Sequence, residues 1–246
     1  EPYRRQRQMC IRDRLHDAYL SVNEALRAAG YYHGKHINIH FIDANEINES
    51  NVAEKLSGCD GVLVPGGFGK RGSEGKISAI KYARENRISF LGICFGMQLA
   101  CIEYARNVIG YTDANSSELD PKTTHPVIDL LANQYEGIDM GGTLRLGLYD
   151  CHIKKETNTY KAYGKEDIKE RHRHRYEFNN QYEEVFSKGL IVTGRNPQQN
   201  LVEIVELTNH PWFVACQFHP EFLSRPQRPH PLFRDFIEAA LKNKKI

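Results

Sequence analysis

The sequence contains no apolar run close to the roughly 18 residues of a membrane span, and no apolar segment of a secretory signal near its start. It also lacks an excess of charge of either sign, because 33 Lys and Arg residues face 31 Asp and Glu residues. A net charge of +2 gives no general attraction for a polyanion. We therefore expect no nucleic-acid partner and no membrane partner.

Paired cysteine motifs are absent, which excludes the usual paired sites. Six cysteines are present: Cys10, Cys59, Cys94, Cys101, Cys151 and Cys216. They form no CxxC motif and no paired zinc spacing, so no metal site is expected. In a chain of 246 residues this usage favours free thiols in a reducing compartment, here the cytoplasm.

The first fourteen residues, EPYRRQRQMCIRDR, differ from the rest of the chain. They hold five arginines and show neither strand nor helix periodicity. We interpret residues 1–14 as a disordered or foreign tail, and a basic arm for an acidic partner is the alternative. Residues 15–246 are then predicted to form a single domain.

Strand patterns alternate with helix patterns through the first half of the domain. Predicted strands cover 36–43, 60–64 and 88–93, and predicted helices cover 15–30, 73–86 and 96–108. This alternation is typical of an α/β fold with a doubly wound, mostly parallel central sheet and helices on both faces. The second half is richer in strands, which are expected at 144–153, 172–179, 189–196, 201–208 and 213–219, before a helix at 230–245.

A cysteine between two glycines lies where a strand pattern becomes a helix pattern. In Gly92-Ile93-Cys94-Phe95-Gly96, small residues suit a sharp turn that presents the central side chain at the sheet edge. The N-terminus of the following helix favours a thiolate, and the N–H of Phe95 can face an oxyanion. The segment therefore predicts a cysteine nucleophile; the alternative is a small buried residue at a tight bend.

A base for that nucleophile is expected late in the chain, in ACQFHPEF. His219 and Glu221 are two residues apart, so in extended chain their side chains face the same way. A carboxylate beside an imidazole fixes its tautomer and supports its charged form. This pair predicts a general base with its orienting group, although most of the eleven histidines have no such role.

A glycine-rich loop, Pro65-Gly66-Gly67-Phe68-Gly69, follows another predicted strand of the same sheet. Glycine lets the backbone approach a substrate closely, so this loop is a candidate for a second oxyanion donor. An ordinary glycine turn is the alternative. The order GxxxxGK[ST] of a phosphate loop is not present.

These three segments together resemble the class I glutamine amidotransferases, whose fold is flavodoxin-like. The strings PGGFGKRGSEGKI, FLGICFGMQLA, RNVIGYTDANSSEL, ERHRHRYEFN and CQFHPEFLSRPQRPHPLF are similar to the glutaminase domain of the CTP synthase family. The resemblance covers residues 15–246. It implies glutamine hydrolysis by a Cys94-His219-Glu221 triad through a glutamyl thioester.

The resemblance also implies how the reacting carbonyl is held and how L-glutamine is bound. Backbone N–H groups of Phe95 and of Gly66 or Gly67 would form the oxyanion hole. The residues expected at the substrate are Phe68, Gln98, Glu118, Arg175 and Tyr176, with Gln98 and Glu118 at the α-amino group and Arg175 at the α-carboxylate. One carboxylate and one guanidinium match the charged ends of an amino acid.

Partners and a regulator follow from the family. The resemblance implies an N-terminal synthetase domain, outside this chain, that uses ATP and Mg²⁺ to aminate UTP to CTP with the released ammonia. No cofactor is expected in the glutaminase domain. GTP is the implied allosteric activator, and Arg71, Gly72 and Glu74 match the responsive lid.

The family's domain also opens with a short apolar strand before residue 15. Residues 1–14 are not expected to form that strand, and its loss would lower stability, because a central parallel strand is buried on both faces.

Three alternatives share some of these residues. A glutaminase subunit of another amidotransferase, or a γ-glutamyl hydrolase, would share the triad but not the longer strings. A catalytically silent docking domain would keep the fold without turnover. A cysteine peptidase on a similar sheet would not react with glutamine analogues.

Overall fold

The structure is a computed structural model that describes residues 6–11, 19–130 and 144–243, the first range as backbone only. The predicted helix at 15–30 is therefore seen from residue 19 onward, and residues 15–18 lie outside the described part. Within that part, no helix is long and apolar enough to cross a membrane.

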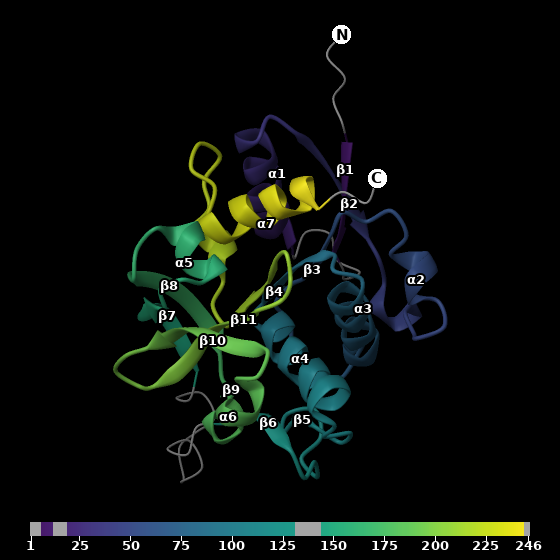
Figure 1. The fold of residues 1–246 in the computed structure, drawn as a ribbon, viewed down its shortest axis with the longest axis vertical. Helices are drawn as coiled ribbons and strands as arrows, with labels where there is room; N and C mark the ends of the chain where they lie inside the picture. Colours follow the sequence, from purple (N-terminus) through teal and green to yellow (C-terminus); the bar gives the residue numbers. More distant parts are fainter. Residues whose placement is uncertain (1–5, 12–18, 131–143, 244–246) are drawn as a thin grey trace.

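The described residues contain one large sheet, with nine strands (Figure 1). Their order across the sheet is β2 (His36–Phe41), β1 (Gln6–Ile11), β3 (Gly61–Val64), β4 (Ser89–Ile93), β12 (Phe213–Cys216), β11 (Leu201–Leu207), β10 (Leu190–Asn196), β7 (Arg145–Ile153) and β8 (Asp167–His174). Neighbouring pairs from β2 to β12 are parallel, and pairs from β12 to β8 are antiparallel. A second, smaller sheet contains β5 (Asn115–Ser116), β6 (Pro126–Asp129) and β9 (Glu177–Phe178).

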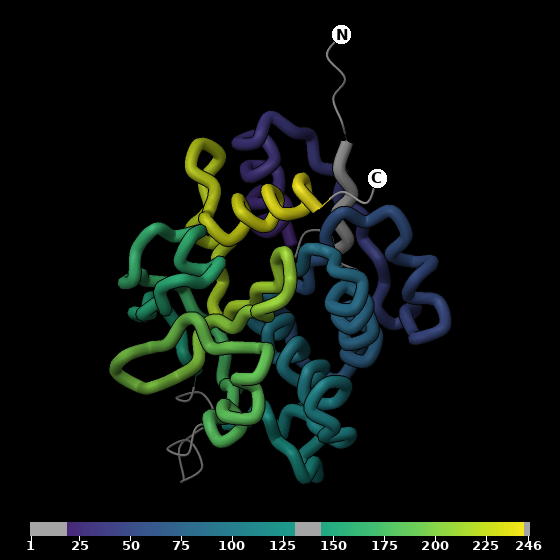
Figure 2. The backbone as a smooth tube through the Cα atoms, in the orientation of Figure 1, coloured from purple at the N-terminus to yellow at the C-terminus, as the bar shows by residue number. Residues whose placement is uncertain are grey.

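Helices cover both faces of the parallel half. Helices α1 (Leu20–Tyr32) and α7 (Pro231–Lys242) lie side by side although they come from opposite ends of the sequence (Figure 2). Helices α3 (Ser73–Glu85) and α4 (Phe95–Tyr104) pack together on the other face (Figure 1). The short helical segments are η2 (Ala44–Glu46), α2 (Val52–Lys55), a π-helix at Ala105–Ile109, α5 (Asn158–Tyr163), η6 (Asn180–Tyr182), α6 (Glu183–Phe186) and η7 (Pro220–Phe222).

Alternate residues of β3 enter two different cores. Leu63 of β3 belongs to the core that contains apolar residues of α1 and α7, whereas Val62 and Val64 belong to the core with α3 and α4. All three side chains are buried. Burial on both faces explains why the strand reads as a continuous apolar run, and it confirms the predicted α/β class.

The expectation that residues 1–14 contain no strand is wrong for Gln6–Ile11. These residues form β1, which lies between β2 and β3; Cys10 is in register with His40 on one side and Val62 on the other. Parallel pairing uses backbone N–H and C=O groups, which every residue of QRQMCI supplies, so no apolar alternation is needed for it.

The expectation of free thiols is also wrong at one position. Cys59 is disulfide-bonded. The free cysteines among the described residues are buried: Cys94, Cys101, Cys151 and Cys216. Disulfide formation depends on Cα atoms that are close in space, which sequence spacing alone does not reveal in a chain of this length.

Candidate active site

The sharp turn predicted around Cys94 is present between β4 and α4. Cys94 has φ 51° and ψ −103°, a conformation that side-chain-bearing residues rarely adopt. A Cβ on Gly92 would lie 2.9 Å from Cβ of Ala215, and one on Gly96 would lie 2.1 Å from the carbonyl oxygen of Val64. Both flanking positions therefore require glycine, because β12 and β3 approach the turn too closely for any side chain.

The turn places the Cys94 thiol at the carboxyl edge of the sheet, against the N-terminus of α4. The backbone N–H of Cys94 donates to the carbonyl of Cys216 at 2.7 Å, which ties the turn to β12. Phe95 is the first residue of α4, and the first N–H groups of a helix have no partner within the helix. The Phe95 N–H is therefore suited to an oxyanion beside the sulfur.

Strand pairing brings His219 to the same edge. In the parallel pair of β4 and β12, Ile93 is in register with Cys216, so the segments after both strands leave the sheet together. The backbone N–H of His219 donates to the carbonyl of Arg171 at 2.8 Å. His219 Nδ1 lies 2.7 Å from Glu221 Oε1, as the two-residue spacing predicts.

The environment of His219 favours the imidazolium. Burial by itself lowers the pKa of His219, but the neighbouring side chains of Cys94 and Glu221 outweigh it and raise this pKa to about 10. The ring also stacks on Phe222, with centroids 5.1 Å apart. Cys94, His219 and Glu221 are thus brought together: the imidazole is hydrogen-bonded to Glu221, and the Cys94 side chain is close enough to raise the pKa of that ring.

The glycine loop after β3 packs directly on this group. A Cβ on Gly66 would lie 2.7 Å from Cε1 of His219 and 3.5 Å from Cβ of Cys94. A Cβ on Gly67 would lie 3.7 Å from the ring of Phe95 and 3.8 Å from Nζ of Lys76. Both glycines therefore border the space beside the sulfur, where a second N–H donor is needed.

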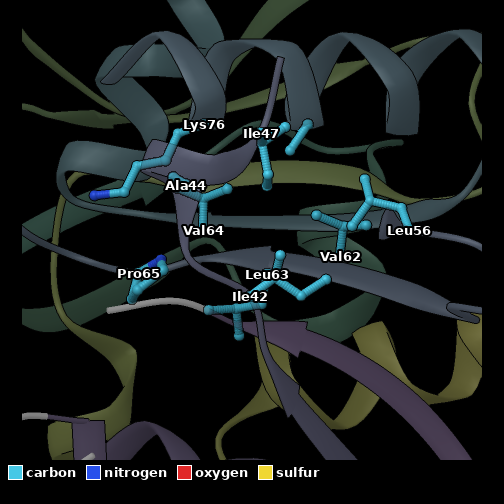
Figure 3. Close-up of a pocket in the computed structure, with 10 residues that line it drawn as sticks. Ile42, Ala44, Ile47, Leu56, Val62, Leu63, Val64, Pro65 and Lys76 are labelled. Carbon is cyan, nitrogen blue, oxygen red and sulfur yellow. The ribbon is translucent and has the colours of Figure 1, made fainter. Parts of the chain in front are cut away.

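A small apolar cavity lies behind the same loop, and it is not the reaction site. Its volume is about 30 Å³, and it is lined by Val64, Pro65 and Lys76 together with apolar residues such as Leu56 (Figure 3). The Lys76 amine extends away from the apolar lining (Figure 3) and lies 5.2 Å from the centre of the Phe95 ring. A cavity of this size holds about one water molecule, so no amino acid fits there.

Four of the five residues predicted at the substrate are linked to one another. Gln98 is buried, and its Nε2 donates to the carbonyl of Tyr176 at 2.9 Å. Burial raises the pKa of Glu118, although a hydrogen bond from the Gly69 backbone and the charge of Arg175 both act to lower this pKa. Burial and the Glu118 charge raise the pKa of Tyr176. The carboxylate of Glu118 and the guanidinium of Arg175 are therefore close enough for their charges to interact, and Glu118 also contacts the backbone of the glycine loop at Gly69.

The remaining predicted residues are Phe68, Arg71, Gly72 and Glu74. Phe68 is 88% exposed, and Arg71 is exposed too. Gly72 has φ 68° and precedes α3, and Glu74 in the first turn of α3 pairs with Arg106 at 2.9 Å. Within the described residues, no hydrogen bond or ion pair joins these four predicted residues to the triad.

Sequence reasoning missed a buried charged cluster beneath the site. Arg145 donates to Glu177 at 3.0 Å and to Glu203 at 2.9 Å, and His172 Nδ1 lies 2.9 Å from His174 Nε2. Burial raises the pKa of Glu177 to about 8 and that of Glu203 to about 7, and it lowers the pKa of His172 to about 3. The signal in the sequence was the alternation of β8, in which His172 and His174 face inward.

Gln217 was also missed. It follows β12, it is fully buried, and its Nε2 lies 3.7 Å from Cys94 Sγ. The signal was a polar residue inside an otherwise apolar strand pattern.

Within the part of the chain that the structure describes, no group of three or more His, Cys, Asp or Glu side chains could hold a metal ion.

Comparisons with known proteins show the family to which the chain belongs. The family model of class I glutamine amidotransferases matches residues 14–239. A CTP synthase from Caldanaerobacter subterraneus is 59% identical over 231 residues, which cover 94% of this chain and 43% of that protein. A CTP synthase from Staphylococcus aureus is 59% identical over 229 residues, 93% of this chain and 43% of that protein. The chain thus spans less than half the length of these curated relatives.

Solved structures of related proteins have the same fold as this chain. The glutaminase domain of CTP synthase from Trypanosoma brucei, solved with bound acivicin, superposes with a TM-score of 0.91. It is 35% identical, and the match covers 98% of this chain and 96% of that one. A glutamine amidotransferase from Thermotoga maritima, 12% identical with a TM-score of 0.58 and 96% of each chain covered, shares the fold.

Proposed function

Because the chain belongs to the class I glutamine amidotransferases, in the branch of CTP synthase glutaminase domains, we propose that it hydrolyses L-glutamine with Cys94 as the nucleophile. The observation that carries this proposal is the cluster of Cys94, His219 and Glu221, in which the Cys94 side chain raises the pKa of an imidazole that is hydrogen-bonded to Glu221. It joins a thiol on a strained turn to an imidazole whose charged form is favoured.

The first half of the reaction forms a thioester and releases ammonia. The Cys94 thiolate attacks the carboxamide carbon of glutamine and forms a C–S bond. The carbonyl oxygen becomes an oxyanion, which the N–H of Phe95 and an N–H of the Gly66–Gly67 loop stabilise. His219 then gives its proton to the departing nitrogen, the C–N bond breaks, and ammonia leaves.

The second half regenerates the enzyme. His219, now neutral, takes a proton from water, and the resulting hydroxide attacks the thioester carbon. The C–S bond breaks, the sulfur leaves as a thiolate, and glutamate is released. Glu221 holds the Nδ1 of His219 throughout, so that Nε2 faces the reacting atoms.

The ends of the substrate have complementary groups nearby. Arg175 would bind the α-carboxylate, and Glu118 would bind the α-ammonium. The hydrogen bonds of Gln98 use its amide nitrogen, so its oxygen is the end that accepts from an ammonium group. Tyr176 and the exposed Phe68 would complete the contacts when substrate is bound.

The wider assignment extends beyond this chain. We propose that its ammonia is used by a synthetase domain that aminates UTP to CTP with ATP and Mg²⁺, because the matched CTP synthases are more than twice as long as the region they share with this chain. GTP activation through Arg71, Gly72 and Glu74 and a cytoplasmic location belong to the same proposal.

The test combines turnover with covalent labelling. The unaltered chain is expected to release glutamate and ammonia from glutamine, and Cys94→Ala is expected to release neither. Acivicin, the compound bound to the Trypanosoma brucei domain, is expected to add to Cys94, with the site identified by mass spectrometry. Cys151→Ala removes a thiol outside the triad and serves as the control, with labelling and turnover retained.

The alternatives predict other outcomes. A silent docking domain would show no turnover in the unaltered chain, even with GTP and the synthetase domain present. A peptidase would cleave peptides and leave acivicin unreacted. A γ-glutamyl hydrolase would prefer γ-glutamyl peptides to free glutamine.

A further inference from the structure

A glutamine side chain contacts the sulfur that reacts in the proposed mechanism. Gln217 Nε2 lies 3.7 Å from Cys94 Sγ, and the Gln217 side chain has no exposed surface. A hydrogen bond inside a protein is electrostatically stronger than the same bond in water. An amide donor at this position therefore acts on the charge of the sulfur without competition from solvent.

The orientation of the Gln217 amide is fixed by a chain of hydrogen bonds. The chain begins at the carbonyl of Tyr176, which can only accept, so Gln98 presents its Nε2 there at 2.9 Å. The same Nε2 donates to Gln217 Oε1 at 3.2 Å. The nitrogen of Gln217 must then point the other way, toward Cys94 Sγ.

Backbone hydrogen bonds also fix the positions of Gln217 and Cys94. The N–H of Gln217 donates to the carbonyl of Glu203 at 2.8 Å, and the N–H of Cys94 donates to the carbonyl of Cys216 at 2.7 Å. Donor and sulfur thus lie on neighbouring segments of one sheet edge, where β4 and β12 are paired. The contact does not depend on a mobile surface side chain.

We propose that Gln217 is a further catalytic residue, whose amide N–H stabilises the Cys94 thiolate and directs the sulfur toward the substrate carbon. This role rests on the proposed use of Cys94 as the nucleophile. A donor interacts more strongly with an ionised acceptor than with a neutral one. The bond is therefore stronger to the thiolate that attacks the substrate, and to the thiolate that leaves the thioester, than to the sulfur of the thioester.

The test measures the thiolate without glutamine. The alkylation rate of Cys94 by iodoacetamide is recorded from pH 5 to pH 10, because only the thiolate reacts. In Gln217→Met, which keeps the length of the side chain and removes the donor, the midpoint of this profile is expected to rise by about one pH unit, the equivalent of a tenfold change in thiolate fraction. The kcat for glutamine hydrolysis is expected to fall by about tenfold with a smaller change in KM.

The matched control is Gln199→Met, the same chemical change on an exposed turn. Its alkylation profile and kcat are expected to equal those of the unaltered chain. A second measurement needs no variant: the side-chain amide protons of Gln217 are expected to shift in NMR spectra with the same pH midpoint as the alkylation rate.

Two results would overturn the proposal. One is an alkylation profile of folded Gln217→Met that coincides with that of the unaltered chain, and the other is a pair of Gln217 amide protons that ignore the thiol titration. Both measurements are independent of glutamine. Failure of the glutaminase assignment, seen as absent turnover in the unaltered chain, is thus distinguished from failure of the Gln217 role.

Discussion

Gly66 lies directly against the imidazole of His219: a methyl group on Gly66 would be 2.7 Å from Cε1 of that ring. The glycine loop after β3 and the histidine after β12 thus fix each other's position at one edge of the sheet. Because the same methyl group would be 3.5 Å from Cβ of Cys94, this contact also sets the space in which the substrate carbonyl must fit.

The first prediction concerns this contact. Gly66→Ala is expected to displace the His219 ring and to lower kcat by about 100-fold, because misplacement of a catalytic group by about 1 Å has effects of that size. The matched variant Gly67→Ala, whose added methyl group meets nothing closer than 3.7 Å, is expected to lose much less. Equal losses in the two variants, measured by ammonia release, would show that the contact is unimportant.

The second prediction concerns the carboxylate behind the histidine. Glu221→Gln removes the charge and is expected to lower the pKa of His219 from about 10, because the hydrogen bond of the ring to a charged carboxylate is weakened. The kcat is expected to fall by at least about tenfold. NMR titration of the His219 ring measures the pKa, and an unchanged titration would contradict the assigned role of Glu221.

The third prediction is a dependence of stability on pH. The pKa of His219 is raised to about 10 in the folded chain from an ordinary value of 6.5. Its contribution to the free energy of unfolding is therefore fully present below pH 6.5 and is lost as pH rises through about 10. Urea unfolding of the unaltered chain and of His219→Gln is expected to show a difference that shrinks over this range, and a difference that grows would refute the assignment.

The fourth prediction concerns the buried charged cluster. Arg145→Met leaves Glu177 and Glu203 without their shared cation and, above a pH of about 8, where both carboxyls of the unaltered chain are ionised, is expected to lower the free energy of unfolding by about 3–5 kcal/mol. Replacing both carboxylates as well, in Arg145→Met/Glu177→Gln/Glu203→Gln, is expected to recover most of that loss. Denaturant unfolding measures both, and a triple variant as unstable as the single one would argue against uncompensated charge as the cause.

The fifth prediction concerns β1. Deletion of residues 1–11 removes a strand that pairs with β2 on one side and β3 on the other, so the melting temperature is expected to fall by several degrees. Deletion of residues 1–5 alone is the control and is expected to have little effect. If residues 1–14 are instead a foreign tail without structure, both deletions leave the melting temperature unchanged.

The local parts of the site could be predicted from the sequence. The glycines at 92 and 96 indicated a tight turn at Cys94, and the two-residue spacing indicated that His219 and Glu221 share a face. These features depend on residues that are close in the chain. Hydrophobic periodicity likewise predicted most strands and helices, because burial on two faces leaves a clear pattern in β3, β4 and β12.

The features that could not be predicted from the sequence depend on contacts between distant segments of the chain. Residues 6–11 have no strand pattern of their own, and their place in the sheet comes from the edges that β2 and β3 offer. Gln217 is only one polar residue in a strand until β4 brings Cys94 beside it.

By itself, then, the sequence determined the turn that lifts the thiol, the histidine–carboxylate pair and the alternation of strands and helices, because these follow from neighbours along the backbone. Only the tertiary structure decided that residues 94 and 219 meet, that Gly66 closes on them, and that Gln217 faces the sulfur. Those contacts arise from strand order and close packing, in which segments more than a hundred residues apart become neighbours.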